Sequence, residues 1–261
     1  MLGLRAKRPV LAVIALLGAT ACTRDPQHTT LTVYAAASLA EVFHELERDF
    51  EAAHPGVDVQ LQLAGSQLLA SQLLEGADAQ VFASANPAQL DRVAEGRQLR
   101  GRRAFAGNSI VVVVPKGSDI GSVVDLANPG CRVVMAGEAV PAGRYAREAL
   151  DTLGLRSAVE ANLISNETDV RGVIGKLALG EADAGLAYAT DVATAEGLIA
   201  LPLPDDAAVT AHYELAVIID GKAEASVLAL ADEFADFVSG PAGAASLAAH
   251  GFSPNPDGST R

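Results

Sequence analysis

Aromatic and basic residues are scarce in this sequence, and their scarcity narrows the range of ligands. Tryptophan is absent, and aromatic residues make up 4% of the 261 residues. Flat platforms on which bases or sugars stack are therefore not expected. Lys and Arg number 19 against 32 Asp and Glu, which gives a formal net charge of −13. Nucleic acids and anionic membrane surfaces bind clusters of Lys and Arg, so this balance argues against both as partners.

Sequence motifs typical of covalent catalysis and of metal binding are missing as well. The five histidines lie far apart, with no H-E-x-x-H or similar metal-binding spacing. No G-x-S-x-G elbow, Walker loop or dinucleotide-binding glycine motif is present. An enzyme, such as a secreted hydrolase, is therefore only a remote alternative, and no cofactor and no directly bound metal cation are expected.

Residues 1–21 have the pattern of an export leader, with a basic start, a short apolar run and small residues at the end. The apolar run is too short to span a bilayer. Cys22 follows directly, and the pattern resembles a bacterial lipobox, in which the cysteine is lipidated and becomes the mature N-terminus. Ala19 stands where such boxes usually have Leu, so an ordinary secretory leader with an incidental Cys22 is the alternative. We expect a polar tether at 22–30 and an extracytoplasmic protein that is anchored to the membrane only through this lipid.

The second cysteine, Cys131, then has no partner for an internal disulfide. It stands at the start of an apolar segment, and we interpret it as a small core residue without chemistry of its own.

The remaining chain alternates strand-like and helix-like segments with short breaks, the pattern of an α/β fold. Half of its residues are hydrophobic, enough for a large core. Apolar periodicity and breaker residues predict strands at 31–35, 57–63, 81–83, 110–114, 131–135, 159–164, 184–188 and 211–220. They predict helices at 38–53, 66–75, 87–95, 141–153, 169–179, 223–238 and 241–250.

The order of these segments predicts two lobes. The wholly apolar run Ile110–Val114 is typical of a strand covered on both faces, and the chain repeats its earlier scheme after it. We assign 31–109 and 203–261 to lobe 1, because the last two helices have no lobe of their own to complete, and 110–202 to lobe 2. Crossings near residues 108 and 203 would form a two-stranded hinge with a ligand cleft between the lobes.

Four helix starts suggest what this cleft binds. Ser38 and Glu41 fit a capping box, which by itself is a structural cap. Three further helices begin at Ser66, around Ala142 and around Val170, so that each lobe contributes two starts. A helix N-terminus presents free N–H groups and behaves as about +0.5 charge, so four approach about +2. If all four face the cleft, they can hold a doubly charged oxyanion without Lys or Arg.

Two long motifs are the most specific in the sequence: Val140-Pro-Ala-Gly-Arg-Tyr-Ala-Arg-Glu-Ala-Leu150 and Gly180-Glu-Ala-Asp-Ala-Gly-Leu-Ala-Tyr-Ala-Thr-Asp191. They resemble motifs of the ModA family, the periplasmic molybdate-binding components of ABC transporters. Similar segments run in unbroken order from about residue 31 to 252, among them Val33-Tyr-Ala-Ala-Ala-Ser-Leu39, Ala64-Gly-Ser-Gln-Leu68 and Val81-Phe-Ala-Ser-Ala-Asn86. The resemblance implies a type II periplasmic-binding-protein fold, molybdate or tungstate as ligand, an ABC permease with its ATPase as partner, and a monomer.

The resemblance also implies the residues that hold the ligand. They are the hydroxyls and amides of Ser38 and Ser66, the backbone amides of Ala142 and Val170, and the phenol of Tyr188. For Tyr188, aromatic packing on the hinge is the alternative. Two segments depart from the family pattern, at 78–80 and at Gly65-Ser66-Gln67, and the second leaves open how the loop at Ser66 bends.

Other binding proteins are nearer rivals than enzymes. A cage of donors suits a fully deprotonated oxyanion, whereas phosphate near neutral pH keeps a proton that needs an acceptor. Sulfate passes that test and must be excluded by its smaller size, so a sulfate-binding or other tetrahedral-oxyanion-binding protein of the same fold stays the alternative. A ferric-ion carrier would use paired tyrosines and carboxylates. A regulator's sensing domain would need a helix-turn-helix segment where the leader stands.

Overall fold

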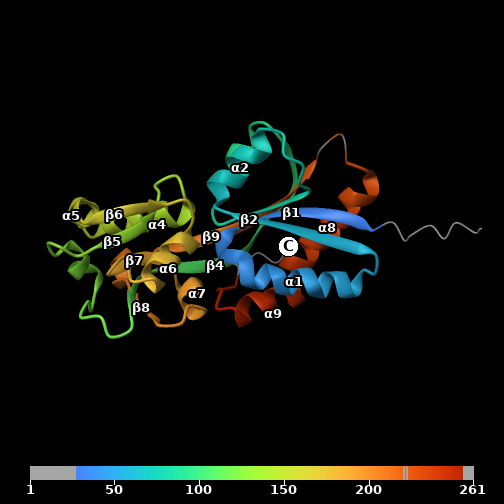
Figure 1. Ribbon diagram of the computed structural model, residues 1–261. Helices are drawn as coiled ribbons and strands as arrows, with labels where there is room; N and C mark the ends of the chain where they lie inside the picture. The colour runs from blue at the N-terminus through green and yellow to red at the C-terminus, as the bar shows by residue number, and fades with distance from the viewer. Residues whose placement is uncertain (1–27, 220, 222, 255–261) are drawn as a thin grey trace, which may run out of the picture.

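The computed structural model describes residues 28–219, 221 and 223–254, and these form two lobes (Figure 1). The leader 1–21, Cys22 and most of the predicted tether lie outside the described residues. The first strand already begins at Thr29, which pairs with Val57. Residues 29 and 30 therefore belong to the fold rather than to the tether.

Lobe 1 is a sheet covered by helices on both faces. Its strand order is β2-β1-β3-β9-β4, with β1 parallel to β2 and β3, and with β9 antiparallel to β3 and β4. The strands are β1 (Thr29–Ala36), β2 (Val57–Ala64), β3 (Val81–Ser84), β9 (Thr210–Ile219) and the first part of β4 (Gln98–Pro115). The helices are α1 (Ala40–Ala53), α2 (Ser66–Leu74), α3 (Pro87–Ala94), α8 (Ala225–Ser239) and α9 (Pro241–Ala249).

The alternation of side chains along the strands produces two apolar layers in this lobe. Phe82 of β3 faces α2 and α3, where it packs with Leu69 and Leu90. Its neighbours Val81 and Ala83 belong to the larger core on the other face, which includes Phe43 of α1 and Phe234 of α8. Successive strand residues point to opposite faces, so a short apolar run can supply both layers. The last two helices, α8 and α9, pack against α1 of this lobe.

Lobe 2 repeats the scheme with a smaller sheet, in the order β4-β7-β5-β6, and with β8 also paired to β4. Strands β5 and β6, and β5 and β7, are parallel, and β4 is antiparallel to β7. The strands are β5 (Val133–Ala136), β6 (Leu163–Glu167), β7 (Ala184–Tyr188) and β8 (Leu198–Pro202). The helices are α4 (Pro141–Thr152), α5 (Arg156–Ala161), α6 (Val170–Ala178) and α7 (Ala189–Ala193).

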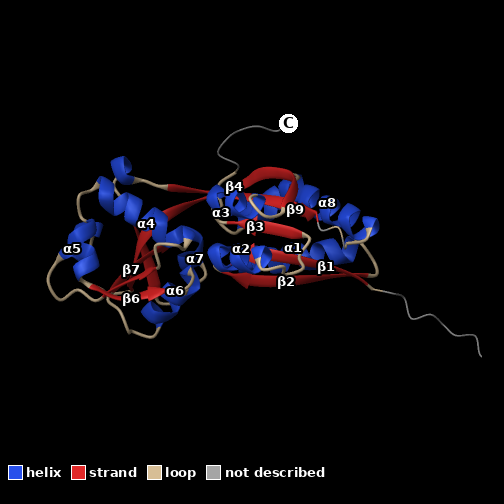
Figure 2. Ribbon diagram, turned by 90° about the horizontal axis from the view of Figure 1, so that it is seen from above, coloured by secondary structure: helices blue, strands red, loops and turns tan. Residues whose placement is uncertain are grey.

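Strand β4 passes from one lobe into the other. Its residues Gln98–Ser109 pair with β9, and from Ile110 onward it pairs with β7 and β8. The chain returns between Pro202, the end of β8, and Thr210, the start of β9. Figure 2 shows the two lobes side by side with strands running between them. Two segments therefore connect the lobes.

Three local predictions in this region were wrong or incomplete. The segment predicted as a strand at 159–164 is helix α5 followed by β6, because a short apolar run with one buried residue, Val159, does not distinguish helix from strand. The first half of β4 was not predicted, since irregularities at Arg100/Arg103 and Ala104/Ala106 break its period of two. The short elements β8 and α7 were also missed.

The parallel strands of both lobes end at the junction between them. In lobe 1 these are β1, β2 and β3, and in lobe 2 they are β5, β6 and β7. In open α/β sheets, ligands bind outside the carboxyl ends of the strands. A ligand site is therefore expected at the loops that follow these six strands.

Candidate functional site

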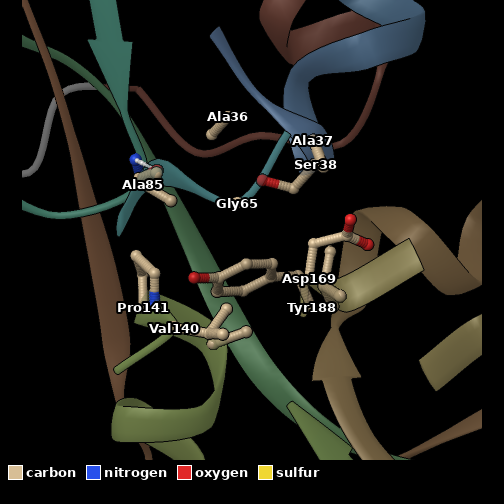
Figure 3. Close-up of a pocket in the computed structure, with 12 residues that line it drawn as sticks. Ala36, Ala37, Ser38, Gly65, Ala85, Val140, Pro141, Asp169 and Tyr188 are labelled. Carbon is tan, nitrogen blue, oxygen red and sulfur yellow. Dashed lines mark hydrogen bonds between the residues drawn. The ribbon is translucent and has the colours of Figure 1, made fainter. Parts of the chain in front are cut away.

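A narrow cavity, open in part to solvent, lies where these strand ends meet (Figure 3). All five residues predicted from the sequence line it. The complete lining is Ala36, Ala37 and Ser38 after β1, Gly65 and Ser66 after β2, Ala85 after β3, Val140, Pro141 and Ala142 at the start of α4, Asp169 and Val170 at the start of α6, and Tyr188 at the end of β7. Lys, Arg and His are absent from this lining.

Ser38 is buried in a short 3₁₀ turn, Ala37–Leu39, which precedes α1. Its Oγ lies 2.8 Å from the hydroxyl of Tyr213 in β9 and caps no helix. Glu41 instead forms an ion pair of 2.7 Å with Arg171 of lobe 2. The predicted capping box is therefore wrong, because partners from distant strands and helices replace the local ones.

The contact with Tyr213 determines what Ser38 can offer a ligand. Burial raises the pKa of the Tyr213 phenol above its ordinary value, so the phenol keeps its proton. A phenol that donates to Ser38 Oγ leaves the serine proton free to point into the cavity. Tyr213 was not singled out from the sequence, where it is one of four scattered tyrosines.

Ser66 begins helix α2, as predicted, and is buried beside the cavity. Its Oγ accepts a hydrogen bond of 3.1 Å from the backbone N–H of Ala85. The acceptor side of this hydroxyl is therefore occupied, and the serine proton is free to be donated. Ser38 is in the same situation when the Tyr213 phenol is the donor in their contact.

The two helix starts of lobe 2 expose backbone donors. Helix α4 begins with Pro141 at its first position and has no side-chain cap, which leaves the first N–H groups, including that of Ala142, without an intrahelical partner. Gly143 allows the helix to begin close to β5, since a Cβ there would collide with the carbonyl oxygens of Gly137 and Ala136. At α6, the Asp169 carboxylate caps the N–H of Gly172 and leaves that of Val170 exposed.

Arg147, buried in α4, supports this wall of the cavity from behind. Its guanidinium donates to the carbonyl oxygens of Ala136 and Gly143, both at 2.9 Å, and pairs with Glu160 at 2.8 Å. It thereby fixes the end of β5 to the first turn of α4, where Ala142 lies.

The hydroxyl of Tyr188 points into the cavity (Figure 3) and has no hydrogen-bond partner among the described residues. The side chain is 1% exposed, and burial raises the pKa of the phenol well above its ordinary value. The ring also packs against Tyr213, with 5.8 Å between the ring centroids. Buried polar groups are nearly always hydrogen-bonded, so an orphaned donor in a cavity indicates a place for an acceptor from a ligand.

Asp191, three residues after Tyr188, is a buried acid for which the sequence alone predicted no role. Burial raises its pKa to about 8, and nearby Glu41 acts in the same direction, whereas Arg171 opposes the shift. Its Oδ2 has no hydrogen-bond partner among the described residues. A carboxyl with this pKa is mostly protonated at neutral pH and adds little negative charge beside the cavity.

The part of the chain that the structure describes contains neither a metal-binding cluster nor a membrane-spanning helix. Within it, no cluster of three or more His, Cys, Asp or Glu side chains could hold a metal ion. No helix in the same ranges combines the length and apolarity needed to cross a membrane. Cys131 is half-buried beside the lobe 2 core, and burial raises the pKa of its thiol.

The sequence around this cavity matches a known protein family. Residues 31–253 match the family of bacterial extracellular solute-binding proteins. The chain belongs to this family. Its members bind solutes and are not enzymes, in agreement with the sequence analysis.

Individual relatives within the family are more informative about the class of ligand. This solute-binding protein is 38% identical over 227 residues to the molybdate-binding protein ModA of Mycobacterium tuberculosis strain H37Rv, a match that covers 85% of this chain and 84% of the relative. It is 29% identical over 227 residues to the putative ABC transporter substrate-binding lipoprotein YvgL of Bacillus subtilis, covering 82% and 86%. The resemblance to the ModA family inferred from the motifs is thus confirmed.

Solved structures place the solute-binding protein in the type II periplasmic-binding fold, as predicted. The periplasmic molybdate-binding protein of Azotobacter vinelandii superimposes with a TM-score of 0.73 at 22% identity, covering 85% of this chain and 98% of that one. The sulfate-binding protein SubI of Mycobacterium tuberculosis H37Rv gives a TM-score of 0.77 at 18% identity, covering 88% of both chains. At these identities the likeness establishes the fold and does not choose between the two ligands.

Proposed function

We propose that this protein captures molybdate, and also tungstate, in the cavity between its lobes and delivers it to an ABC permease. The observation that carries the proposal is the orphaned Tyr188 hydroxyl, which points into a cavity formed by helix starts and serine hydroxyls and free of basic side chains. The identity to ModA over most of the chain supports the same ligand.

The proposed ligand set consists of neutral donors only. The hydroxyls of Ser38 and Ser66, the phenol of Tyr188 and the backbone amides of Ala142 and Val170 donate to the oxyanion, together with the amides of the two serines. Seven hydrogen bonds to a charged group at about 1.5–3 kcal/mol each give about 10–21 kcal/mol before the cost of association. A micromolar dissociation constant needs a net of about 8 kcal/mol, so no Lys or Arg is required.

Transport follows from the two-lobe design. The ligand binds donors of both lobes at once, so it stabilises the closed form and shifts the population toward it. The closed form then docks on the permease, which its ATPase drives. We place lobe 2 at 110–202, because β4 changes partners between Ser109 and Ile110. Lobe 1 then comprises the described residues on either side, beginning with Thr29 of β1.

The same proposal includes export and anchoring. We propose that residues 1–21 are removed, that Cys22 is lipidated, and that the protein works as a monomer on the outer side of the membrane. The name of the Bacillus subtilis relative supports the lipid anchor. Mass spectrometry of the purified full-length protein tests it: a diacylglyceryl mass on Cys22 is expected, and its absence would favour an ordinary secretory leader.

Isothermal titration of the wild-type protein with molybdate, tungstate, sulfate and phosphate tests the ligand. We expect tight, similar binding of molybdate and tungstate, much weaker binding of sulfate, and none of phosphate. Phosphate keeps a proton that a cage of donors cannot accept, and sulfate is too small to reach all donors. Tighter binding of sulfate than of molybdate would replace the proposal with the sulfate-binding alternative.

A further inference from the structure

Two contacts span the cleft outside the proposed ligand set, and both end on the start of α6 in lobe 2. The side-chain amide of Gln67, in the first turn of α2, donates to the backbone oxygen of Thr168 at 2.8 Å. The carboxylate of Glu41, in the first turn of α1, pairs with Arg171 at 2.7 Å. The start of α6 is thus tied to both ligand-facing helix starts of lobe 1.

Gly65 lies beside the first of these contacts and lines the cavity. A Cβ built on it would lie 2.6 Å from the backbone oxygen of Thr168, across the cleft. Its other close neighbours belong to the end of the Gln67 side chain, which can turn away. Only the backbone of the opposite lobe therefore demands a glycine, since Gly65 has φ −58° and ψ 133°, which any residue can adopt.

We propose that Gly65, the Gln67–Thr168 hydrogen bond and the Glu41–Arg171 ion pair form a latch that holds the cleft closed over the oxyanion, and that Gly65 sets how closely the lobes approach. This inference rests on the proposed function, because it assigns the latch to the same cavity. Gly65 is then a specificity-determining residue: the approach of Thr168 to its bare Cα fixes the separation of α2 and α6 and hence the size of the cavity.

The latch has a kinetic consequence that a purely structural role lacks. Contacts made only in the closed form add no free energy to the open form that first meets the ligand. Their loss therefore leaves the association rate nearly unchanged and accelerates dissociation. The chain contains no Trp, so the fluorescence of Tyr188 and Tyr213 can report binding in a stopped-flow instrument.

Gly65→Ala is the sharpest variant, because its backbone conformation suits alanine and the added methyl group acts on both parts of the contact with Thr168: it meets the Thr168 backbone oxygen and displaces the Gln67 side chain. If the closed fraction falls to a tenth, the affinity falls about tenfold, and the loss appears as faster dissociation. Small-angle scattering of the ligand-saturated variant should give a larger radius of gyration than that of the wild type. Gly175→Ala in α6 is the matched control, because nothing lies within 4 Å of the added methyl group.

Gln67→Met keeps the length of the side chain and removes the donor to Thr168. The Gln67 backbone oxygen keeps its own partners, Ser71 and Arg92, so the start of α2 stays in place. We expect dissociation to accelerate by about five- to tenfold, the usual value of one hydrogen bond.

The half-exposed ion pair is tested by a double-mutant cycle that consists of Glu41→Gln, Arg171→Gln and the double variant. We expect the two substitutions to be coupled by about two- to fivefold in the dissociation rate. The control is Arg132→Gln, which removes an ion pair with Asp183 that lies within lobe 2 and does not involve the start of α6.

The wild-type titrations and the variant kinetics separate the two claims. Failure of wild type to prefer molybdate overturns the proposed function, while the latch is still judged on whichever oxyanion binds. Dissociation rates of Gly65→Ala and Gln67→Met equal to those of wild type, with unchanged scattering, overturn the latch alone. Slower association at unchanged dissociation would also overturn it.

Discussion

The hydroxyl of Tyr213 in β9 lies 2.8 Å from the Oγ of Ser38, across 175 positions of sequence. We expect the two residues to form a relay in lobe 1, in which the phenol donates to the serine oxygen and the serine proton is left for the cavity. The backbone N–H of Ala85 donates to Ser66 Oγ in the same sense. Each serine hydroxyl would then be oriented by a donor outside the proposed ligand set.

Replacing Tyr213 with Phe removes this orienting donor and keeps the ring, which also contacts Phe105 and Phe252. Ser38 can then turn its proton away, so we expect oxyanion binding to weaken by about 1 kcal/mol, roughly fivefold. Titration calorimetry measures the change, and thermal unfolding of the ligand-free variant serves as the control for folding. Unchanged affinity in a folded variant would contradict the relay.

Replacing Tyr188 with Phe should move binding and stability in opposite directions. The hydroxyl has no partner among the described residues, so its removal relieves a buried unsatisfied group, and the ligand-free protein should be as stable as wild type or more stable. Binding should weaken by about 1–3 kcal/mol, because the phenol no longer donates to the oxyanion. Denaturant unfolding and calorimetry give the two numbers. A destabilised variant with normal affinity would instead support a role in hinge packing.

Asp191 should make stability fall as pH rises. Its pKa is about 8 in the folded protein against an ordinary 3.8, so the folded state holds a proton that the unfolded state has released between these values. The contribution to the free energy of unfolding is complete below about pH 4 and is lost toward pH 8, at up to about 1.4 kcal/mol per pH unit.

The variant Asp191→Asn cannot titrate and isolates this contribution. Its free energy of unfolding relative to wild type should rise between pH 5 and pH 8, as measured by denaturant unfolding at several pH values. The exposed Asp183, whose pKa is lowered by its hydrogen bond with Arg132, gives the control: Asp183→Asn should show no such trend in that window. A flat difference for Asp191→Asn would contradict the protonated state.

Ligand binding should raise the melting temperature by mass action. A hundredfold excess of free molybdate over its dissociation constant stabilises the folded state by about 2.7 kcal/mol. Sulfate at the same concentration should have a much smaller effect, because its affinity is lower. Differential scanning calorimetry with equal ionic strength in all samples measures both shifts. Equal shifts for the two anions would contradict selection by size.

Much of the fold follows from local patterns in the sequence. The β-branched run Ile110–Val114, the proline and glycine after α1, and the serine that opens α2 each act within a few residues, so they could be recognised without the structure. Where a pattern was short or interrupted, as in α5 and in the first half of β4, the prediction failed. The prediction of a second lobe rested on the same alternation, which the sequence repeats after Ile110.

The capping box at Ser38 shows the limit of such patterns. Spacing alone fits Ser38 and Glu41 to each other, but in the folded chain Ser38 bonds Tyr213 and Glu41 bonds Arg171, 130 positions away. A local hydrogen bond and a distant one differ little in free energy, so tertiary contacts decide between them.

The sequence by itself determined, within two residues, where the four helices beside the cavity begin, and that these starts carry serines or bare amides, since turns and helix starts depend on neighbours within a few positions. Only the tertiary structure decided that the Tyr188 hydroxyl is left without a hydrogen-bond partner among the described residues. It also decided that Ser38 and Ser66 contact polar groups of distant segments, and that Gly65 lies against the backbone of Thr168 across the cleft. The physical reason is that the polarity and size of an enclosed cavity depend on contacts between segments far apart in the chain, which bring no signal to either segment alone.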